Sequence, residues 1–252
     1  MIAAPNVLVQ VEACPRCAHP SDAAAQFCEQ CGRSRLDLPL AAVRSHVGSV
    51  RPTNQDAAVL CVLDGAVTAV VCDGVASASH ADAAARDASV AAAVAIRRSG
   101  LASAVGAAMG AVSAIPFAAG DEPPACTLVA TRVTSGCVEV VSVGDSRAYW
   151  FGIEGIVTLT ADHAIGHDLT RWIGIDADVE SIECQRHVPR EAGWLVLCTD
   201  GVWNMVDMSD IAHAVADLDP DGAATLADLL VDRALSAGGL DNITAVVVRV
   251  EP

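Results

Sequence analysis

The segment "TAVVCDGVAS", from Thr68 to Ser77, is an apolar run that ends in a carboxylate and a glycine. A second segment, "WLVLCTDGVW" from Trp194 to Trp203, ends in the same way. Short apolar runs bounded by turn residues are typical of buried strands. One Asp-Gly pair after a strand is usually an ordinary turn. Two in one chain indicate that both strands deliver an aspartate to the same place.

The composition predicts one medium-sized domain with a small appendage, because 252 residues are ample for a sizeable core. Hydrophobic residues make up 53% of the chain and aromatic residues only 3%, so Ala, Val, Leu and Ile must fill the interior. The net charge of −16 argues against a nucleic-acid partner, since phosphates attract basic surfaces. The same charge suits a protein that gathers carboxylates around cations.

No segment is expected to cross a membrane or to direct export. The first residues, "MIAAPNVLVQVEACP", lack the basic region of a signal peptide. Residues 99–120 carry no charge and are long enough to consider as a span, but Ala, Gly and Ser dominate them and Pro116 interrupts them. We therefore expect a small-residue helix packed on a sheet, in a soluble, cytoplasmic protein with mostly reduced cysteines.

The cysteines fall into two sets. Cys14, Cys17, Cys28 and Cys31 form two C-x-x-C pairs in "CPRC…CEQCG". This arrangement predicts a tetrahedral Zn²⁺ site, with a dithiol redox pair as the alternative. Because all four ligands come from the protein, the metal is expected to fold a short segment that serves as support or as a dock for a protein partner. The other six are expected to be buried small apolar residues: Cys61, Cys72, Cys126, Cys137, Cys184 and Cys198.

The chain divides into a zinc ribbon (residues 1–35), a connector (36–43) and a main domain (44–252). In the main domain, strands, helices, strands, helices and a last strand follow one another, with Ser79 as the expected cap of the first helix. Hairpins dominate and strand–helix alternation is weak, so the order predicts an α+β fold with mostly antiparallel sheets. The expected strands are 57–63, 66–72, 126–133, 137–143, 147–151, 182–188, 194–198 and 243–250, and the expected helices are 79–100, 101–115, 209–218 and 222–236.

Five aspartates stand where predicted strands begin or end. If several of these carboxylates meet, their mutual repulsion must be compensated. Hard divalent cations do this best, and an all-oxygen set of ligands suits Mg²⁺ or Mn²⁺. Each aspartate alone is a weak signal, but the set favours a metal site. Its members are Asp56, Asp73, Asp145, Asp200 and Asp241.

Six short motifs occur in one order along residues 44–250. They are "RPTNQD" (51–56), "VCDGV" (71–75), "VGDSRAYW" (143–150), "LTADH" (159–163), "LCTDGVW" (197–203) and "DNITAVVV" (241–248). In this order they resemble the metal-dependent Ser/Thr protein phosphatases of type 2C, the PPM family, in its bacterial form. The resemblance implies a four-layer α/β/β/α sandwich of two antiparallel sheets flanked by helices. It also implies hydrolysis of phosphoserine and phosphothreonine in proteins that a Ser/Thr kinase has phosphorylated.

The resemblance assigns the metal ligands residue by residue. Asp73 would bridge two Mn²⁺ or Mg²⁺ ions. The Gly74 carbonyl and Asp56 would lie nearby as ligands, some of them through water. Asp200 and Asp241 would bind the second ion.

The resemblance also assigns a third ion and a phosphate ligand. Asp145, together with Asp200, would match the third-metal position of bacterial relatives. Arg51 would grip the substrate phosphate, which a planar guanidinium can do through two parallel hydrogen bonds. A water activated between two cations would then attack phosphorus, so no cysteine or serine nucleophile is required.

Two departures from the family pattern bear on activity. Gln55 stands where the family usually has a glutamate, which removes one negative charge beside Asp56. The flap that follows "LTADH" is short, because "AIGHDLTRWIG" (164–174) arrives almost at once. His163 and His167 lie in this stretch and are minor candidates for proton donation to the leaving group.

These departures leave two alternative functions open. The first is a phosphoprotein-binding module of the same fold, weakly active or inactive, with the zinc ribbon as its partner dock. The second is a zinc-ribbon adaptor whose large domain only carries the ribbon.

Overall fold

The computed structural model describes residues 41–252 except residues 64, 178–181 and 217. Before residue 41 it describes nine residues: Cys17, His19, Phe27, Cys28, Gln30, Cys31, Gly32, Leu38 and Leu40. The predicted zinc ligand Cys14 lies outside the described residues.

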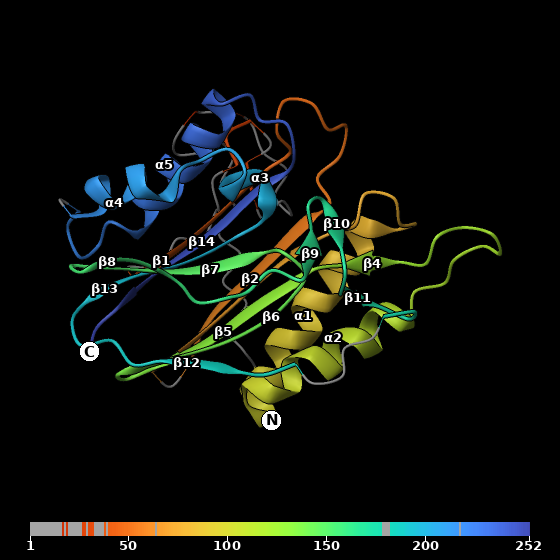
Figure 1. Ribbon diagram of the computed structural model, residues 1–252, viewed down its shortest axis with the longest axis horizontal. Helices are drawn as coiled ribbons and strands as arrows, with labels where there is room; N and C mark the ends of the chain where they lie inside the picture. The colour runs from red at the N-terminus through yellow and green to blue at the C-terminus, as the bar shows by residue number, and fades with distance from the viewer. Residues whose placement is uncertain are drawn as a thin grey trace.

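Two five-stranded antiparallel sheets form the centre of the molecule (Figure 1). The first has the spatial order β1-β14-β13-β7-β8, with bounds β1 (Ala41–His46), β14 (Ile243–Val250), β13 (Gly193–Cys198), β7 (Arg147–Gly152) and β8 (Gly155–Thr158). The second has the order β12-β6-β5-β3-β2, with bounds β12 (Gln185–His187), β6 (Cys137–Val143), β5 (Leu128–Thr134), β3 (Ala66–Asp73) and β2 (Asp56–Leu63). Two short pairs lie beside them: β4 (Ala125–Cys126) with β11 (Ile173–Gly174), and β9 (Ala164–Ile165) with β10 (Asp168–Leu169).

Helices cover the outer face of each sheet (Figure 1). On the second sheet these are α1 (Ala81–Ser99) and α2 (Ala104–Ser113), joined by a 3₁₀ turn at Leu101–Ser103. On the first sheet they are α4 (Met208–Ala216) and α5 (Ala223–Ser236), after the short helix α3 (Asp200–Trp203). The predicted four-layer sandwich of two antiparallel sheets flanked by helices is therefore confirmed.

The strands read as continuous apolar runs because both of their faces are buried. In β3, Ala69 and Val71 face the other sheet, whereas Val70 and Cys72 pack against the helices. The first sheet follows the same alternation, with Leu195 and Leu197 of β13 facing inward. Since successive side chains point to opposite faces, each central strand contributes to two of the three apolar layers.

Small residues let the helices lie close to the second sheet. The buried face of α1 consists mainly of alanines, and α2 buries Ala104, Ala108 and Val112. The small-residue helix expected within residues 99–120 is therefore present and packed on a sheet. Within the described ranges, the helices are all too short or too polar to cross a membrane.

Two local predictions were wrong. Ser79 does not cap α1, because its hydroxyl donates to the Glu122 carbonyl and His80 precedes the helix in a left-handed conformation (φ 52°). Residues 41–43, which the sequence analysis assigns to the connector, form the first half of β1. The sequence did not predict this strand because charged and polar residues interrupt its apolar pattern. Arg44 is nevertheless fully buried, and its Nε donates to Asp228 Oδ1 of α5 at 2.6 Å.

Candidate metal and phosphate site

Strands of both sheets deliver aspartates to one end of the sandwich. Asp56 begins β2 and pairs in register with Asp73, which ends β3. Asp200 opens α3 directly after β13, and Asp241 lies just before β14. The strands β3 and β13 belong to different sheets, yet Asp73 and Asp200 line the same cavity. Asp145 joins them from the turn between β6 and β7.

A cavity of about 440 Å³ lies where these strand ends meet. Four of the five aspartates line it, together with Arg51, Gln55 and Gly74. Asp56 does not line the cavity; its Oδ2 accepts a hydrogen bond from Thr199 Oγ1 at 2.9 Å. The lining aspartates are Asp73, Asp145, Asp200 and Asp241.

Burial, together with the charges of neighbouring aspartates, raises the pKa values of four of the five aspartates. Burial raises the pKa of Asp56 to about 7, and burial, then Asp200, raises the pKa of Asp145 to about 6. Burial, followed by the charges of Asp56 and Asp200, raises the pKa of Asp73 well above its usual range. The pKa of Asp200 is also raised, by burial and then by Asp241. A cluster of this kind gains stability from cations that let all its members ionise.

The donor set fits hard divalent cations. The carboxylates and the neighbouring Gly74 carbonyl would supply oxygen ligands, which Mg²⁺ and Mn²⁺ prefer. Within the described chain, Asp56 Oδ1 is buried and has no hydrogen-bond partner. A buried carboxylate oxygen without a partner is costly, so its position favours a bound cation or a cation-bound water.

Arg51 places a permanent positive charge at the cavity. Its Nη2 donates to Asp241 Oδ2 at 2.6 Å, and about a third of each side chain is exposed (37% and 32%). Because the cavity contains both this guanidinium and the carboxylate cluster, a phosphate held between bound cations and Arg51 would be neutralised from two sides.

Asn242 fixes the loop that carries Arg51, a role that the sequence analysis missed. Its Oδ1 accepts from the Gln55 amide at 2.8 Å, and its Nδ2 donates to the carbonyls of Val47 and Thr53 at 2.8 and 2.9 Å. The side chain is 3% exposed, so these bonds are shielded from water. The motif "DNITAVVV" contains Asn242, but only the distant partners 47–55 reveal what the amide does.

Buried hydroxyls, among them those of Thr199 and Ser146, hold the strand ends in place. Thr199 Oγ1 donates to Asp56 and accepts from the Thr244 amide at 3.1 Å. Thr127 Oγ1 accepts from the Asp73 amide at 3.0 Å and contacts Ser146 Oγ at 2.7 Å. These bonds link the two sheets and the 143–147 turn directly behind the carboxylates.

The glycines that follow Asp73 and Asp200 are required by space. A Cβ on Gly201 would lie 1.9 Å from the Asn242 carbonyl oxygen, and a Cβ on Gly74 would lie 2.6 Å from the Ala81 carbonyl oxygen. Neither glycine has a positive φ. The repeated Asp-Gly sequence therefore marks two places where a second backbone passes directly beside the carboxylate-bearing strand end.

The backbone of Asp145 is anchored by an aromatic residue. Trp203 Nε1 donates to the Asp145 carbonyl at 3.0 Å, and the Arg147 guanidinium lies 3.5 Å from the centre of the Trp203 ring. Arg147 also pairs with Asp162 at 2.6 Å. This stacked arrangement of Arg147, Trp203 and Asp162 was not anticipated from the sequence.

The short flap forms one rim of the cavity. His167, Asp168 and Trp172 line the cavity from the β9–β10 hairpin and the residues after it. His163 does not line it: its Nδ1 accepts from the Gly144 amide at 3.3 Å, and burial lowers its pKa. Of the two histidines considered for proton donation, only His167 borders the cavity.

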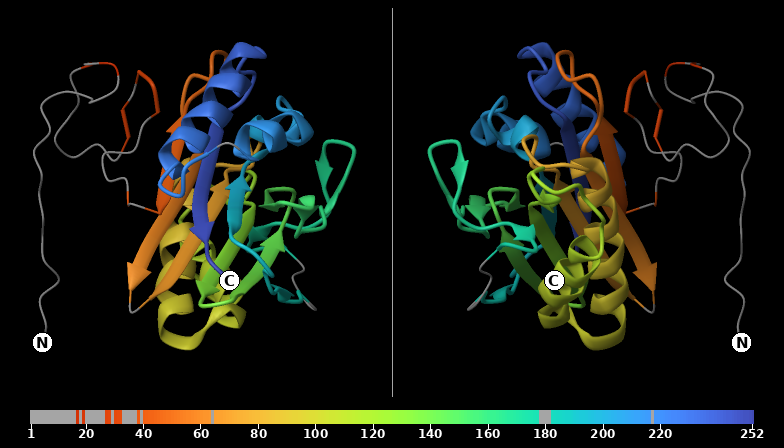
Figure 2. Two further views of the ribbon diagram at one scale, coloured as in Figure 1. Left: turned by 90° about the vertical axis from the view of Figure 1, so that its left-hand side faces the viewer. Right: turned by 90° about the vertical axis from the view of Figure 1, so that its right-hand side faces the viewer.

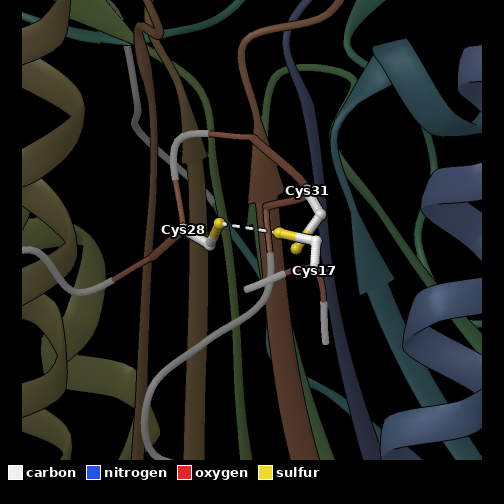
Figure 3. A group of neighbouring side chains, drawn as sticks. All are labelled: Cys17, Cys28 and Cys31. Carbon is white, nitrogen blue, oxygen red and sulfur yellow. Dashed lines mark hydrogen bonds between the residues drawn. The ribbon is translucent and has the colours of Figure 1, made fainter. Parts of the chain in front are cut away.

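Three of the four predicted zinc ligands lie together beside the edge strand β1, between the two helical layers (Figures 2 and 3). The sulfur atoms of Cys17, Cys28 and Cys31 are all within 4.8 Å of one another, and those of Cys17 and Cys28 are 3.6 Å apart. Thiolates at these separations suit a soft-ligand metal such as Zn²⁺.

The remaining cysteines follow the expectation with two exceptions. Cys72, Cys126, Cys137 and Cys198 are buried, and burial raises the pKa of Cys198, so its thiol is a poor nucleophile despite lying near the aspartates. Cys61 is only partly buried and Cys184 is exposed, contrary to the prediction for them.

This chain is similar to known proteins both in sequence and in structure. The family model described as Protein phosphatase 2C matches residues 44–230. The Serine/threonine phosphatase stp of Listeria welshimeri is 30% identical over 145 residues, which cover 48% of this chain and 55% of that protein. The chain thus aligns with about half the length of the curated relatives it matches.

Solved structures share the fold over most of the chain. The PPM Ser-Thr phosphatase MsPP from Mycobacterium smegmatis, in complex with cacodylate, is 26% identical with a TM-score of 0.67, and the match covers 85% of this chain and 100% of that chain. The catalytic domain of the phosphatase PstP, in complex with 2 manganese ions, is 23% identical with a TM-score of 0.67, over 84% and 98% of the two chains. The family match, which covers most of the chain, and the shared architecture lead to one conclusion: this chain belongs to the protein phosphatase 2C family.

Proposed function

We propose that this protein is a metal-dependent phosphatase that hydrolyses phosphoserine and phosphothreonine in proteins. One observation carries the proposal: strand ends of two different sheets bring Asp73, Asp145, Asp200 and Asp241 to one cavity that also contains Arg51. Family membership and the manganese-bound PstP structure support the same activity. The substrate class is a phosphoprotein that a Ser/Thr kinase has modified.

The aspartates are proposed to hold two divalent cations, Mn²⁺ or Mg²⁺. Asp73 contributes ligands to both, with the Gly74 carbonyl and Asp56 beside it, and Asp200 and Asp241 hold the second ion. Bound dications supply a water of lowered pKa and neutralise phosphoryl oxygens. The buried hydroxyl of Thr199 orients Asp56 for this role.

Asp145 and Arg51 complete the proposed site. Asp145, with Asp200, provides a place for a third cation. Arg51 binds the phosphate and keeps the reacting ester aligned, while its bond to Asp241 fixes the guanidinium at the cavity edge. Gln55 lines the cavity with its backbone already held by Asn242, so loss of the usual glutamate leaves the loop in place.

We also propose that residues 1–35 form a zinc ribbon in which Cys14, Cys17, Cys28 and Cys31 bind a structural Zn²⁺, before a connector and a phosphatase domain (44–252). The grouping of three of these sulfurs supports the site. The ribbon is the proposed dock for a protein partner. Elemental analysis of the purified protein should find about one zinc per chain.

Hydrolysis of p-nitrophenyl phosphate and of a phosphothreonine peptide tests the main proposal. The wild-type protein should turn over both only with Mn²⁺ or Mg²⁺. Replacing Asp200→Asn should lower kcat/KM by about 10²–10³-fold, because one cation ligand and its charge are lost. Asp221→Asn, at an exposed aspartate that does not line the cavity, is the matched control and should leave the rate unchanged.

The same experiment distinguishes a phosphatase from a phosphoprotein-binding module of the same fold that does not hydrolyse its ligand. A wild-type protein that binds the phosphopeptide but shows no metal-dependent turnover would establish the binding module instead. Unchanged turnover in Asp200→Asn would remove the aspartate cluster from the mechanism.

A further inference from the structure

The turn that contains Cys28 and Cys31 is joined to the end of the edge strand β1. The Gly32 amide donates to the Cys28 carbonyl at 2.8 Å, and the Gly32 carbonyl accepts from the Ser45 amide at 3.1 Å. Cys28 is 2% exposed, so the turn is packed against the main domain. β1 pairs with β14 along one edge, and the cysteine turn bonds to it at Ser45 (Figure 2). The turn thus satisfies part of an open sheet edge.

His46, the last residue of β1, connects this turn to the next loop through both of its ring nitrogens. Its Nδ1 accepts a hydrogen bond from the Gly48 amide at 2.9 Å, and its Nε2 lies 3.2 Å from the Gln30 carbonyl oxygen. Since a backbone amide can only donate, Nδ1 carries no proton and the ring hydrogen is on Nε2. The ring therefore donates to Gln30, which lies between Cys28 and Cys31.

The Gly48 end of this connection touches the candidate site. Gly48 has a positive φ of 82°, and a Cβ there would lie 2.2 Å from the Asp241 carbonyl oxygen. The adjacent Ser49 amide donates to the Gly239 carbonyl at 2.7 Å. Arg51, three residues after Gly48, bonds the Asp241 side chain. Gly48–Arg51 is therefore closely packed along the segment that carries one of the proposed metal ligands.

Ser45 makes a second connection of the same kind. Its amide donates to Gly32, while its hydroxyl accepts from Asn54 Nδ2 at 2.9 Å. Two successive residues at the end of β1 thus each bind the cysteine turn on one side and the 47–55 loop on the other. The loop is held at both of its ends from the same place.

We propose that His46 is a positioning residue through which metal binding at the cysteines strengthens phosphate binding in the cavity. The inference rests on the proposed roles of Arg51 and of the cysteine site. A metal orders the Cys28–Gly32 turn, which fixes the Gln30 carbonyl and, through His46, the start of the Arg51 loop. A loop that is already ordered loses less conformational entropy when phosphate binds, which gives positive coupling between the two sites.

His46→Asn tests the connection, because an asparagine amide oxygen can replace Nδ1 as the acceptor for Gly48 but cannot reach Gln30. The metal site is removed separately with Cys28→Ser combined with Cys31→Ser. The affinity for inorganic phosphate is measured by titration calorimetry in saturating Mn²⁺, and the zinc content is measured on each sample. His213→Asn, an exposed histidine on α4, is the matched control.

Either change should weaken phosphate binding by about 3–10-fold, and the two together should weaken it no more than either alone. Hydrogen exchange at residues 47–55 should accelerate in both variants and not in His213→Asn. The inference is overturned if the two effects multiply, if phosphate affinity and exchange are unchanged after zinc is lost, or if wild-type protein does not bind phosphate. Should the cysteine variant fail to fold, His46→Asn alone decides: unchanged phosphate affinity and exchange overturn the inference.

These readouts do not depend on turnover. A wild-type protein that binds phosphate and shows the coupling but hydrolyses no phosphoester would contradict the proposed function and leave the coupling intact. If the wild-type protein is an active phosphatase but His46→Asn binds phosphate as tightly as wild type, the proposed function stands and the coupling is contradicted.

Discussion

The aspartate cluster and the cysteine cluster differ in how the protein holds their side chains in position. The aspartates sit on the ends of buried strands from both sheets, so their positions are fixed by the core before any cation binds. The cysteines sit on a short peripheral segment joined to the edge strand β1 by a few hydrogen bonds. The carboxylates of the first cluster repel one another inside a rigid frame, whereas the second cluster is the proposed zinc site on a segment outside the two sheets. Rigid oxygen ligands suit catalysis with exchangeable dications, and soft thiolates suit a permanent structural ion.

The largest effect is expected where the core touches the aspartate cluster. Gly201→Ala places a Cβ 1.9 Å from the Asn242 carbonyl oxygen, which forces apart α3 and the start of β14. We expect unfolding free energy to fall by about 3 kcal/mol or more and phosphatase activity to be lost. Chemical denaturation and p-nitrophenyl phosphate hydrolysis measure both.

The control for this substitution is Gly106→Ala in α2, where the added Cβ meets nothing within 4 Å. This change should stabilise the protein by about 0.5–1 kcal/mol, because alanine is the better helix former. If both variants had the same free energy of unfolding and the same activity, the close contact between Gly201 and Asn242 would not be required for the site.

A smaller effect is expected from pH in metal-free protein. The folded-state pKa of Asp56 is raised from 3.8 to about 7 and that of Asp145 to about 6. Groups with raised pKa contribute stability that is complete below pH 3.8 and is lost as pH rises through 6 and 7. Thermal unfolding in chelator should therefore show Tm falling by at least about 5 °C between pH 5 and pH 8, and saturating Mn²⁺ should restore most of it.

The control for the pH experiment is Asp56→Asn, which removes one of the titrating groups and should flatten the profile. A metal-free Tm that rises between pH 5 and pH 8, in a range where other carboxylates are already ionised, would contradict the raised pKa values.

The smallest effect is expected from the peripheral cluster. Cys28→Ser with Cys31→Ser should leave the main unfolding transition within about 2 °C of wild type, because β1, the strand that the cysteine turn bonds, is paired with β14 along its whole length. The KM for p-nitrophenyl phosphate should rise by about 3–10-fold with little change in kcat, since the 47–55 loop carries the proposed phosphate ligand Arg51 and none of the proposed metal ligands. A collapse of the whole fold would show that the two clusters are not independent in stability.

Much of the architecture could be predicted from the sequence because buried strands have a simple signature. Runs such as residues 243–250 are apolar on both faces, and β-hairpin turns separate them. The strand β1 was missed because Arg44 and His46 interrupt its apolar pattern. The partner of Arg44 is Asp228, far away in sequence, and the partner of His46 is Gln30, in the segment before the main domain. Ser79 failed as a helix cap because the Glu122 carbonyl, also distant, competes for its hydroxyl.

In the candidate site, too, some residues could be predicted from the sequence and others could not. The aspartates and Arg51 were identified from short motifs, since each motif is local. The supporting contacts of Asn242, Trp203 and His46 were not, because each depends on a partner that only folding brings within hydrogen-bond distance.

The sequence by itself determined which residues carry charge and sulfur, where strands begin and end, and to which family the pattern is similar. Only the tertiary structure decided that Asp73 and Asp200, at the ends of strands from different sheets, line one cavity, where burial and the charges of Asp56 and Asp200 raise the pKa of Asp73. It also decided that Asn242 and His46 hold the loop of Arg51. The physical reason is that secondary structure follows from side-chain patterns along the chain. Electrostatic coupling and buried hydrogen bonds instead depend on distances between residues that are far apart in sequence.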